Sequence, residues 1–304
     1  MSFLVFAGAV QQGLVYALTA LSLLVSYRVL GLADLTVDGS FTLGAAVSGA
    51  LALAGHPWLG LAAGLAAGAA AGLVTAFLQT RCGVAPILAG ILTMTALYSI
   101  NLMVMGGRSN LQLLRAATVF RPAQALGADL GPTLLLAAVA GLCGGALALF
   151  LRSGPGLALR AAGDNPEMVR ASSIDPARAV RAGLALANAL AALSGALMAQ
   201  YRQFVEVSGG TGTVVLGLAS LVIGEAVVRG GGMARRIAGA VLGAVLYQLL
   251  LSLALSAAVT PQNMKLVSAV LVAAAIGLPT ARRRLAQERK KRKAVRENAA
   301  RDRA

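Results

Sequence analysis

The sequence predicts an all-α, polytopic membrane protein, and three observations support this prediction. Of the 304 residues, 58% are hydrophobic and only 12% are charged, with a mean hydropathy of +0.79. A soluble protein of this composition would expose far too much apolar surface. The apolar residues fall in separate runs of about 20, the length at which an α-helix spans the hydrocarbon core. The alternating pattern of a membrane β-barrel is absent from the sequence, so helices are expected.

The apolar runs predict about nine crossings, within a range of about eight to ten because two of the helices are broken. The runs cover residues 3–30, 40–54, 57–79, 85–105, 132–151, 183–200, 214–228, 237–257 and 264–278. The third run carries glycine at every fourth position from Gly60 to Gly72, a small-residue stripe that lets a neighbouring helix approach closely. No basic segment or cleavage site precedes the first run, so we expect an uncleaved membrane helix there.

Residues 1–281 are expected to form one transmembrane domain, which contains a charged central stretch at 154–181, and residues 282–304 a basic tail. The tail holds eleven Lys/Arg against three Asp/Glu, and therefore eight of the +15 net charges. Such a tail is typical of the cytoplasmic side, where it contacts anionic lipid. No aromatic residue interleaves it, which argues against nucleic acid. The same charge bias places the central stretch in the cytoplasm and the N-terminus outside.

An internal repeat is also predicted. A long apolar run followed by a glycine-bearing polar insert occupies 13–36, before a helix from Ser40, and the same order recurs at 183–207, before a helix from Val214. By the predicted topology the two units face opposite ways. Inverted repeats with broken helices are typical of transporters, because irregular backbone at membrane depth is tolerated only where it lines a cavity.

The polar residues of the two inserts are the candidates for a translocation pathway. They are Asp34, Thr36, Asp38, Ser40, Thr42, Glu206, Ser208, Thr211 and Thr213. Carboxylates at membrane depth are costly and therefore indicate function. The alternative is that Asp38 and Ser40 only cap the resumed helix. Glu225 and Arg229 are a candidate gate, and the alternative there is a simple i,i+4 ion pair.

The sequence contains no enzyme motif that we can assign. None of the four lysines is followed by Ser or Thr, so no Walker A loop is present, and GxSxG is absent too. His56 is the single histidine, which excludes a two-histidine metal motif, and Cys82 and Cys143 form no CxxC. We therefore expect no catalytic residue, no metal and no cofactor in this chain, which leaves a membrane-embedded enzyme as the weakest interpretation.

The central stretch contains two helix-start patterns. The residues DNPE at 164–167 combine capping side chains, a proline at the first helical position and an acid in the first turn, and DP at 175–176 repeats the pattern. They predict a short helix at 166–172 and a second one that runs into the next crossing. The short helix, with Met168 as its apolar contact, suits a groove in a soluble partner. The alternative is an interfacial connector with snorkelling arginines.

Two segments resemble those of one protein family. RAAGDNPEMVRASSIDPARAVRAGLALANALAALSGALMAQY and DLTVDGSFTLGAAVSGAL resemble, in the family's order, segments of ABC importer permease subunits of the branched-chain amino acid and ribose (simple sugar) group. The resemblance covers about residues 10 to 280. DLTVDGSF with GLASLVIGEAV is most similar to permeases of tryptophan/tyrosine or uncharacterised amino-acid systems. The chain departs from the better-known branches at Gly224-Glu225, where they have a glycine pair, and lacks the extra first helix of the sugar permeases.

The resemblance implies a permease subunit for a small polar solute, an amino acid first and a sugar or nucleoside as alternatives, in a bacterial inner membrane. It implies a homodimer, cytoplasmic ABC ATPase subunits that hold ATP-Mg, and an extracytoplasmic substrate-binding protein. It assigns coupling to the ATPase to Asp164, Asn165, Pro166, Glu167, Met168 and Arg170. The alternative function is a stand-alone secondary transporter or channel, driven by an ion through Asp34, Asp38 or Glu206.

Overall fold

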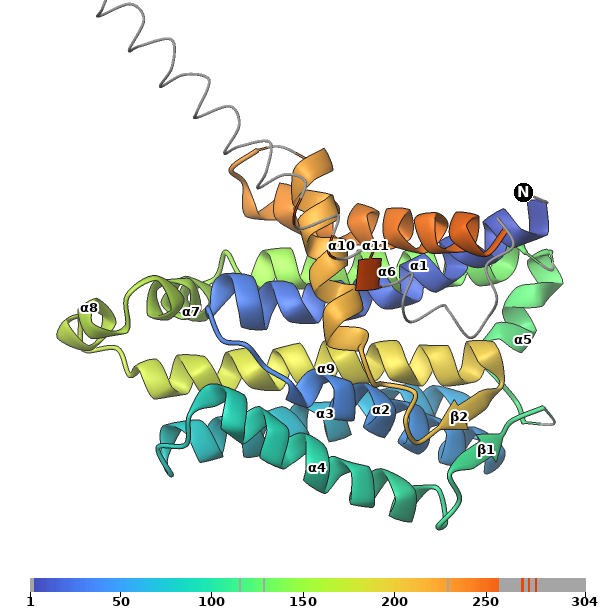
Figure 1. The fold of residues 1–304 in the computed structure, drawn as a ribbon, viewed down its shortest axis with the longest axis horizontal. Coiled ribbons are helices and arrows are strands. Elements are labelled where there is room, and N and C mark those ends of the chain that lie inside the picture. The colour runs from blue at the N-terminus through green and yellow to red at the C-terminus, as the bar shows by residue number, and fades with distance from the viewer. Residues whose placement is uncertain are drawn as a thin grey trace, which may run out of the picture.

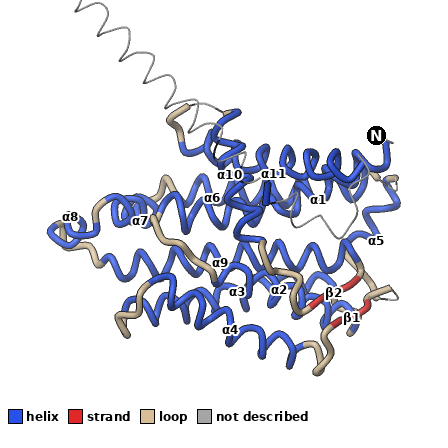
Figure 2. Tube along the Cα trace, in the orientation of Figure 1, coloured by secondary structure: helices blue, strands red, loops and turns tan. Residues whose placement is uncertain are grey.

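The computed structural model describes residues 3–256 except 115, 128 and 229, together with 269, 270, 273 and 277, and is almost entirely helical (Figures 1 and 2). In this part of the chain the elements are α1 (Phe3–Leu23), the π-helical segment η1 (Leu24–Val29), α2 (Thr36–Leu53), α3 (Pro57–Thr80), α4 (Pro86–Val104), β1 (Asn110–Gln112), α5 (Phe120–Ala123), the 3-10 helix η2 (Gln124–Leu126), α6 (Leu130–Phe150), α7 (Gly154–Asp164), α8 (Pro166–Ala171), α9 (Pro176–Arg202), β2 (Phe204–Glu206), α10 (Thr213–Val227) and α11 (Met233–Ser256).

Seven helices within the described ranges are long and apolar enough to cross a membrane. They are Val5–Val29, Thr36–Leu53, Pro57–Thr80, Pro86–Val104, Leu130–Phe150, Pro176–Arg202 and Met233–Ala254. The shorter apolar helix α10 matches the run predicted at 214–228. The prediction of an all-α, polytopic membrane protein is confirmed. The last predicted crossing, 264–278, lies outside the described residues except for four single positions, and the basic tail lies outside them entirely.

Helix α9 forms the centre of the molecule. Figure 1 shows it between a layer that contains α1, α6 and α11 and a layer that contains α2, α3 and α4, while α10 crosses from one layer to the other. Every residue of α9 from Ala187 to Gln200 is buried. A helix that is enclosed on all sides is a core element. The first broken helix, α1 with α2, therefore packs on α9, and α9 is itself the first half of the second one.

The glycine stripe of α3 packs against α9, as the sequence predicts. A methyl group on Gly68 would overlap the Ala192 side chain and the backbone of Asn188, and one on Gly72 would overlap the backbone of Leu184. Small residues allow this approach, and van der Waals contact between helices is what holds them together in lipid.

Gly68→Leu is expected to separate α3 from α9 and to destabilise the protein by about 1–3 kcal/mol or more, because the added atoms have no space. The measurement is thermal unfolding in detergent. Gly141 on α6 provides the matched control, since a methyl group there meets nothing within 4 Å. A Gly141→Leu variant that loses as much stability as Gly68→Leu would contradict the packing argument.

The two predicted repeat units do run in opposite directions. The Tyr201 hydroxyl near the end of α9 donates to Gln11 Oε1 near the start of α1 at 2.8 Å, whereas Gly183 near the start of α9 packs against Leu30 after η1. Helix α9 ends where Gln203 adopts a left-handed conformation with φ of 58°. Each long helix is followed by a break and a second helix, α2 or α10, so the inverted arrangement is confirmed.

The first break is shorter than predicted. Helix α2 begins at Thr36 rather than Ser40, because Asp34 Oδ1 accepts the Thr36 backbone N–H at 2.9 Å and so satisfies a free donor of the first turn. The residues from Thr36 to Gly39 are therefore helical, which corrects the prediction that the helix resumes only at Ser40.

The two polar ends of the molecule differ. In Figure 1, α7 and α8 lie at one end of the long helices, and the N-terminus, α5 and the antiparallel pair of β1 with β2 lie at the other. Asn165 Oδ1 caps α8 by accepting the backbone N–H groups of Glu167 and Met168, both at 3.1 Å, and Asp175 caps α9. Both predicted helix starts are confirmed. The prediction missed α7, which precedes them.

Candidate functional site

The two polar inserts meet at Asp38. This residue of α2 accepts the backbone N–H groups of Gly212 and Val214 and the hydroxyl of Thr213, at 2.8–2.9 Å. These donors form the start of α10, so the carboxylate satisfies free N–H groups and faces the positive end of the helix dipole. Asp38 therefore caps a helix, but the helix is α10 of the other repeat unit and not α2 as the alternative interpretation had it.

A buried polar network fixes the first break to α9. The Asn188 amide donates to Asp34 Oδ2 at 2.7 Å and accepts the Ser40 hydroxyl at 2.7 Å. Thr36 Oγ1 lies 2.8 Å from Thr75 Oγ1 of α3, which extends the network to a third helix. Because the carboxylate, the amide and these hydroxyls are all buried and bonded, the network holds the break in one conformation. The sequence analysis missed Asn188, although it is one of only two amides in the apolar run at 183–200.

Asn188→Leu is expected to lower stability by roughly 2–3 kcal/mol, because it leaves the Asp34 carboxylate and the Ser40 hydroxyl without their buried partner. Thermal unfolding in detergent is the measurement. The double variant D34N/N188D exchanges the two side chains, so an amide donor still faces a carboxylate. It should recover part of the lost stability. Unfolding of Asn188→Leu at the wild-type temperature would refute the role of the network.

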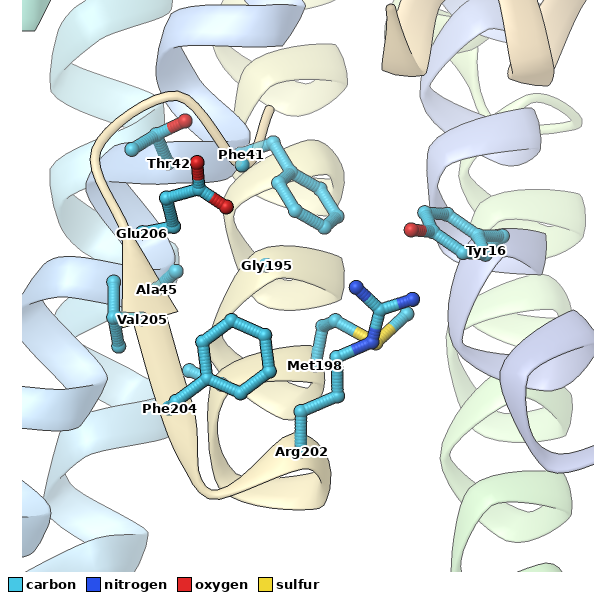
Figure 3. A pocket seen from close by; sticks show the side chains of 12 residues that line it. Tyr16, Phe41, Thr42, Ala45, Gly195, Met198, Arg202, Phe204, Val205 and Glu206 are labelled. Carbon is cyan, nitrogen blue, oxygen red and sulfur yellow. The ribbon is translucent and has the colours of Figure 1, made fainter. Parts of the chain in front are cut away.

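Two cavities adjoin the junction of the inserts. The first, of about 40 Å³, lies between α1, α2, α9 and β2, and Figure 3 shows the Arg202 and Glu206 side chains pointing into it, with Tyr16 on the facing helix. The second, of about 180 Å³, lies between α2, α4 and the loop before α10. Thr42 lines both, and its hydroxyl accepts the Gly210 backbone N–H at 3.0 Å.

The structure divides the predicted pathway residues into two groups. Those bonded inside the protein are Asp34, Thr36, Ser40, Thr42 and Thr213, all of them buried. Glu206, Ser208 and Thr211 are exposed, and the Ser208 hydroxyl donates to Glu206 Oε1 at 2.6 Å. Asp38 is intermediate and lines the larger cavity. The structure thus brings the two inserts together, and only part of their polar groups faces a cavity.

Glu225 forms a two-point ion pair with Arg28 of η1. The Nε and Nη2 atoms of Arg28 each lie 2.6 Å from one Glu225 oxygen, which joins η1 to the C-terminal half of α10. The sequence suggested Arg229 as the partner, one turn along, and that residue lies outside the described part of the chain. A cavity of about 210 Å³ next to the ion pair is lined also by Arg235 and Arg236.

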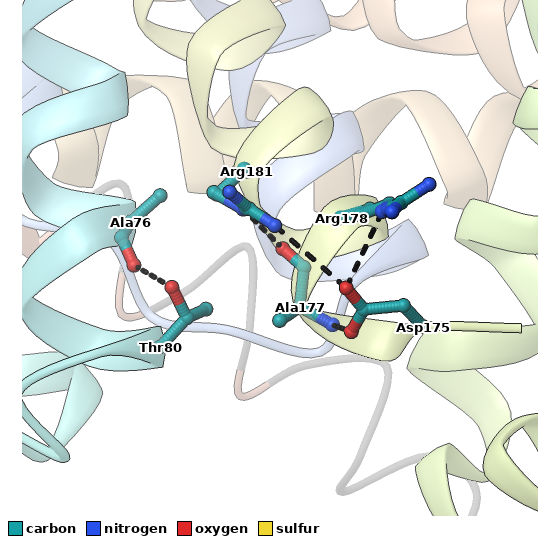
Figure 4. A network of polar contacts seen from close by, with 6 residues as sticks. All are labelled: Ala76, Thr80, Asp175, Ala177, Arg178 and Arg181. Atoms are coloured by element: carbon teal, nitrogen blue, oxygen red, sulfur yellow. Dashed lines mark hydrogen bonds and ion pairs between the residues drawn. The ribbon is translucent and has the colours of Figure 1, made fainter.

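Helix α8 presents an almost fully exposed surface. Of its residues only Val169 is buried, at 1% exposure, and it anchors the helix in the core, while Met168 is 58% exposed. The six predicted coupling residues are all exposed: Asp164, Asn165, Pro166, Glu167, Met168 and Arg170. Figure 4 shows the start of the following helix, α9, where Asp175 pairs with Arg178 and Arg181 at 3.5 and 3.7 Å. A short, exposed helix anchored by one buried side chain can press on another protein.

Metal ligands do not gather in the described residues, where no group of three or more His, Cys, Asp or Glu side chains is close enough to hold an ion.

Residues 5–276 match the family described as the permease component of branched-chain amino acid transport systems. The chain belongs to this family. The resemblance noted in the sequence is thereby confirmed, and the protein is a multi-pass membrane permease.

Two curated proteins are similar to this permease over most of their length. The tyrosine transport system permease protein of Clostridioides difficile (strain R20291) is 36% identical over 214 residues, 70% of each chain. The uncharacterized protein RP368 of Rickettsia prowazekii (strain Madrid E) is 32% identical over 225 residues, 72% of this chain and 76% of the relative. No solved structure matches the chain significantly.

Proposed function

We propose that this permease imports an amino acid as the membrane subunit of an ABC transporter, driven by ATP that a separate ATPase binds and hydrolyses. The observation that supports this most strongly is the junction of two inverted, broken helices at Asp38 in a chain of the permease family. A second copy of the chain, as a homodimer, would complete the pathway. We place the complex in a bacterial inner membrane, with the N-terminus outside and the C-terminus in the cytoplasm.

We assign the ATPase contact to α8 and the residues around it. Met168 and Glu167 project from a helix that Val169 fixes to the core, so force applied to α8 reaches α9 through a rigid connection. Helix α9 in turn holds the first break through Asn188 and leads directly into the second. The coupling set is Asp164, Asn165, Pro166, Glu167, Met168 and Arg170, and ATP-Mg belongs to the partner.

We assign different roles to the two groups of polar residues. The solute passes the residues that line cavities or are exposed at the junction: Asp38, Thr42, Glu206, Ser208 and Thr211. The group that holds the breaks in place consists of Asp34, Thr36, Ser40 and Thr213. Glu225, paired with Arg28, forms a gate at the α8 end of the pathway, to which Arg229 would add a further charge.

Two considerations support an amino acid as the solute. The curated relative from Clostridioides difficile is named a tyrosine transport system permease, so tyrosine is the first candidate. The family name refers to branched-chain amino acids, which makes leucine the second. An extracytoplasmic binding protein delivers the solute in this proposal. Ribose and a nucleoside are the comparison compounds.

The test is uptake into proteoliposomes that contain this chain and its co-purified ATPase, with the binding protein and radiolabelled tyrosine, leucine, ribose or adenosine added outside. We expect uptake of an amino acid that requires hydrolysable ATP and persists when ion gradients are abolished. If the chain alone imports solute without ATP, and this uptake stops when an ion gradient is collapsed, the protein is a secondary transporter and the proposal is refuted. Uptake of ribose or adenosine only would refute the solute class.

A further inference from the structure

The larger cavity at the junction has a defined chemical character. Its volume is about 180 Å³, several times the roughly 30 Å³ that one water takes in the liquid. The lining residues are Asp38, Gly39, Thr42, Met94, Thr95, Tyr98, Asn101, Val207 and Thr211. They include one carboxylate and no basic side chain. A solute group that donates hydrogen bonds or carries positive charge is therefore favoured over an anion.

Asn101 of α4 supplies a buried acceptor to this cavity. Its side chain is 1% exposed, and its Nδ2 donates to the carbonyl oxygen of Gly39 at 3.4 Å. Because a carbonyl oxygen only accepts, this contact orients the amide and directs the other atom, Oδ1, away from Gly39. Oδ1 is buried and has no hydrogen-bond partner among the described residues. Buried acceptors are nearly always bonded in folded proteins, so this one calls for a donor.

Three other polar side chains of the cavity are already bonded. Both Asp38 oxygens accept from the start of α10, Thr42 Oγ1 accepts from Gly210, and the Thr95 hydroxyl donates to the Ile91 carbonyl oxygen at 2.7 Å. Tyr98, half exposed, adds an aromatic ring, the kind of group that attracts a cation over its face. Among the described residues that line the cavity, Asn101 Oδ1 is thus the buried acceptor left free for a solute, beside a carboxylate and an aromatic ring.

We propose that this cavity is a subsite for the ammonium group of the transported amino acid, which donates one hydrogen bond to Asn101 Oδ1. The negative charge of Asp38 and the ring of Tyr98 favour the same cation. The α2–α4 contact that shapes the cavity depends on Gly39, where a methyl group would lie 2.9 Å from Leu97 Cδ1. The inference rests on the proposed function, since it specifies which end of the solute the pathway recognises.

The first test compares Asn101→Leu and Asn101→Asp in the reconstituted complex with its ATPase and binding protein. Asn101→Leu removes the hydrogen bond to the charged ammonium group of the solute. The loss of such a bond should raise KM roughly ten-fold. Asn101→Asp keeps an acceptor but loses the donor to the Gly39 carbonyl, so its KM should lie between those of the wild type and Asn101→Leu. Met103→Leu on the same helix, at a position 74% exposed, is the control. An unchanged KM in Asn101→Leu would overturn the subsite.

Thermal unfolding separates this role from a structural one. Oδ1 has no protein partner and the Nδ2 bond to the Gly39 carbonyl is long at 3.4 Å, so Asn101→Leu should lose little stability and unfold close to the wild-type temperature, whereas a purely structural asparagine would make the variant unfold much earlier. If the wild-type complex imports an amino acid and Asn101→Leu has the same KM, the subsite is refuted but the proposed function is not. Absence of amino-acid uptake by the wild type refutes the proposed function.

A second test needs no transport. Cys82 and Cys143 are first replaced by alanine, and Asn101→Cys is then treated with cationic or anionic methanethiosulfonate reagents in nanodiscs. We expect faster labelling by the cationic reagent, and slower labelling when tyrosine is present but not when its deaminated acid is. Equal rates for the two reagents, or equal protection by the deaminated acid, would overturn the subsite whatever the complex imports.

Discussion

Replacement of Glu167 and Met168 together by alanine is expected to abolish most ATP-driven uptake while ATP hydrolysis continues. Met168 is the largest exposed apolar side chain on α8, and truncation of a central apolar contact in an interface commonly costs about 2 kcal/mol or more. That loss corresponds to roughly a thirty-fold fall in uptake. The measurement is the ratio of solute imported to ATP hydrolysed in proteoliposomes.

Leu157→Ala on the neighbouring helix α7 is the matched control, because Leu157 is 52% exposed and lies outside the coupling set. It should leave the ratio unchanged. Both variants should unfold at the wild-type temperature, since neither side chain is part of the core. Normal uptake by the double variant would show that the ATPase grips another part of the chain.

Asp38→Ala is expected to have the largest effect on both folding and transport. It removes three hydrogen bonds to a carboxylate at the start of α10. Loss of a helix cap alone costs about 0.5–2 kcal/mol, and bonds to a charged group are about twice as strong as neutral ones, so a loss of about 3 kcal/mol is expected. Transport should be undetectable, because the start of α10 is released. Thermal unfolding and uptake measure the two effects.

Ser208→Ala provides the comparison from the same junction, since its exposed hydroxyl contacts only the neighbouring Glu206 carboxylate. Its stability should remain within about 0.5 kcal/mol of wild type, as is usual for surface substitutions. Asp38→Asn should fall between the two, because it keeps one oxygen acceptor and turns an NH₂ group toward a backbone donor. Wild-type stability in Asp38→Ala would refute the capping role.

The features that the sequence predicted correctly are those encoded locally. The starts of α8 and α9 follow from Asn165-Pro166 and Asp175-Pro176, because a cap and its N–H partners lie within three residues of each other. The membrane helices follow from hydrophobic runs, and the approach of α3 to α9 follows from the glycine stripe. The sequence does not predict helix α7, because its residues are mixed in polarity and lie within the charged central stretch.

The features that were missed join distant parts of the chain. Asp38 meets α10 across 174 to 176 positions and Arg28 meets Glu225 across 197, and a single sequence contains no signal for such pairs. Asn188 and Asn101 lie inside apolar runs, where one amide is a weak signal. Their significance depends on which polar atoms lie next to them after folding, which only the tertiary structure determines.

Helix α10 is fastened at both ends to the first repeat unit, by Asp38 at its start and by Arg28 near its end. The two attachments differ in strength. The Arg28 and Glu225 side chains are 48% and 33% exposed, so water and salt screen their two-point ion pair. The Asp38 attachment is partly buried and has three bonds. When ATPase movement reaches this helix, we expect the weaker attachment to open first, so that α10 swings about a pivot at Asp38.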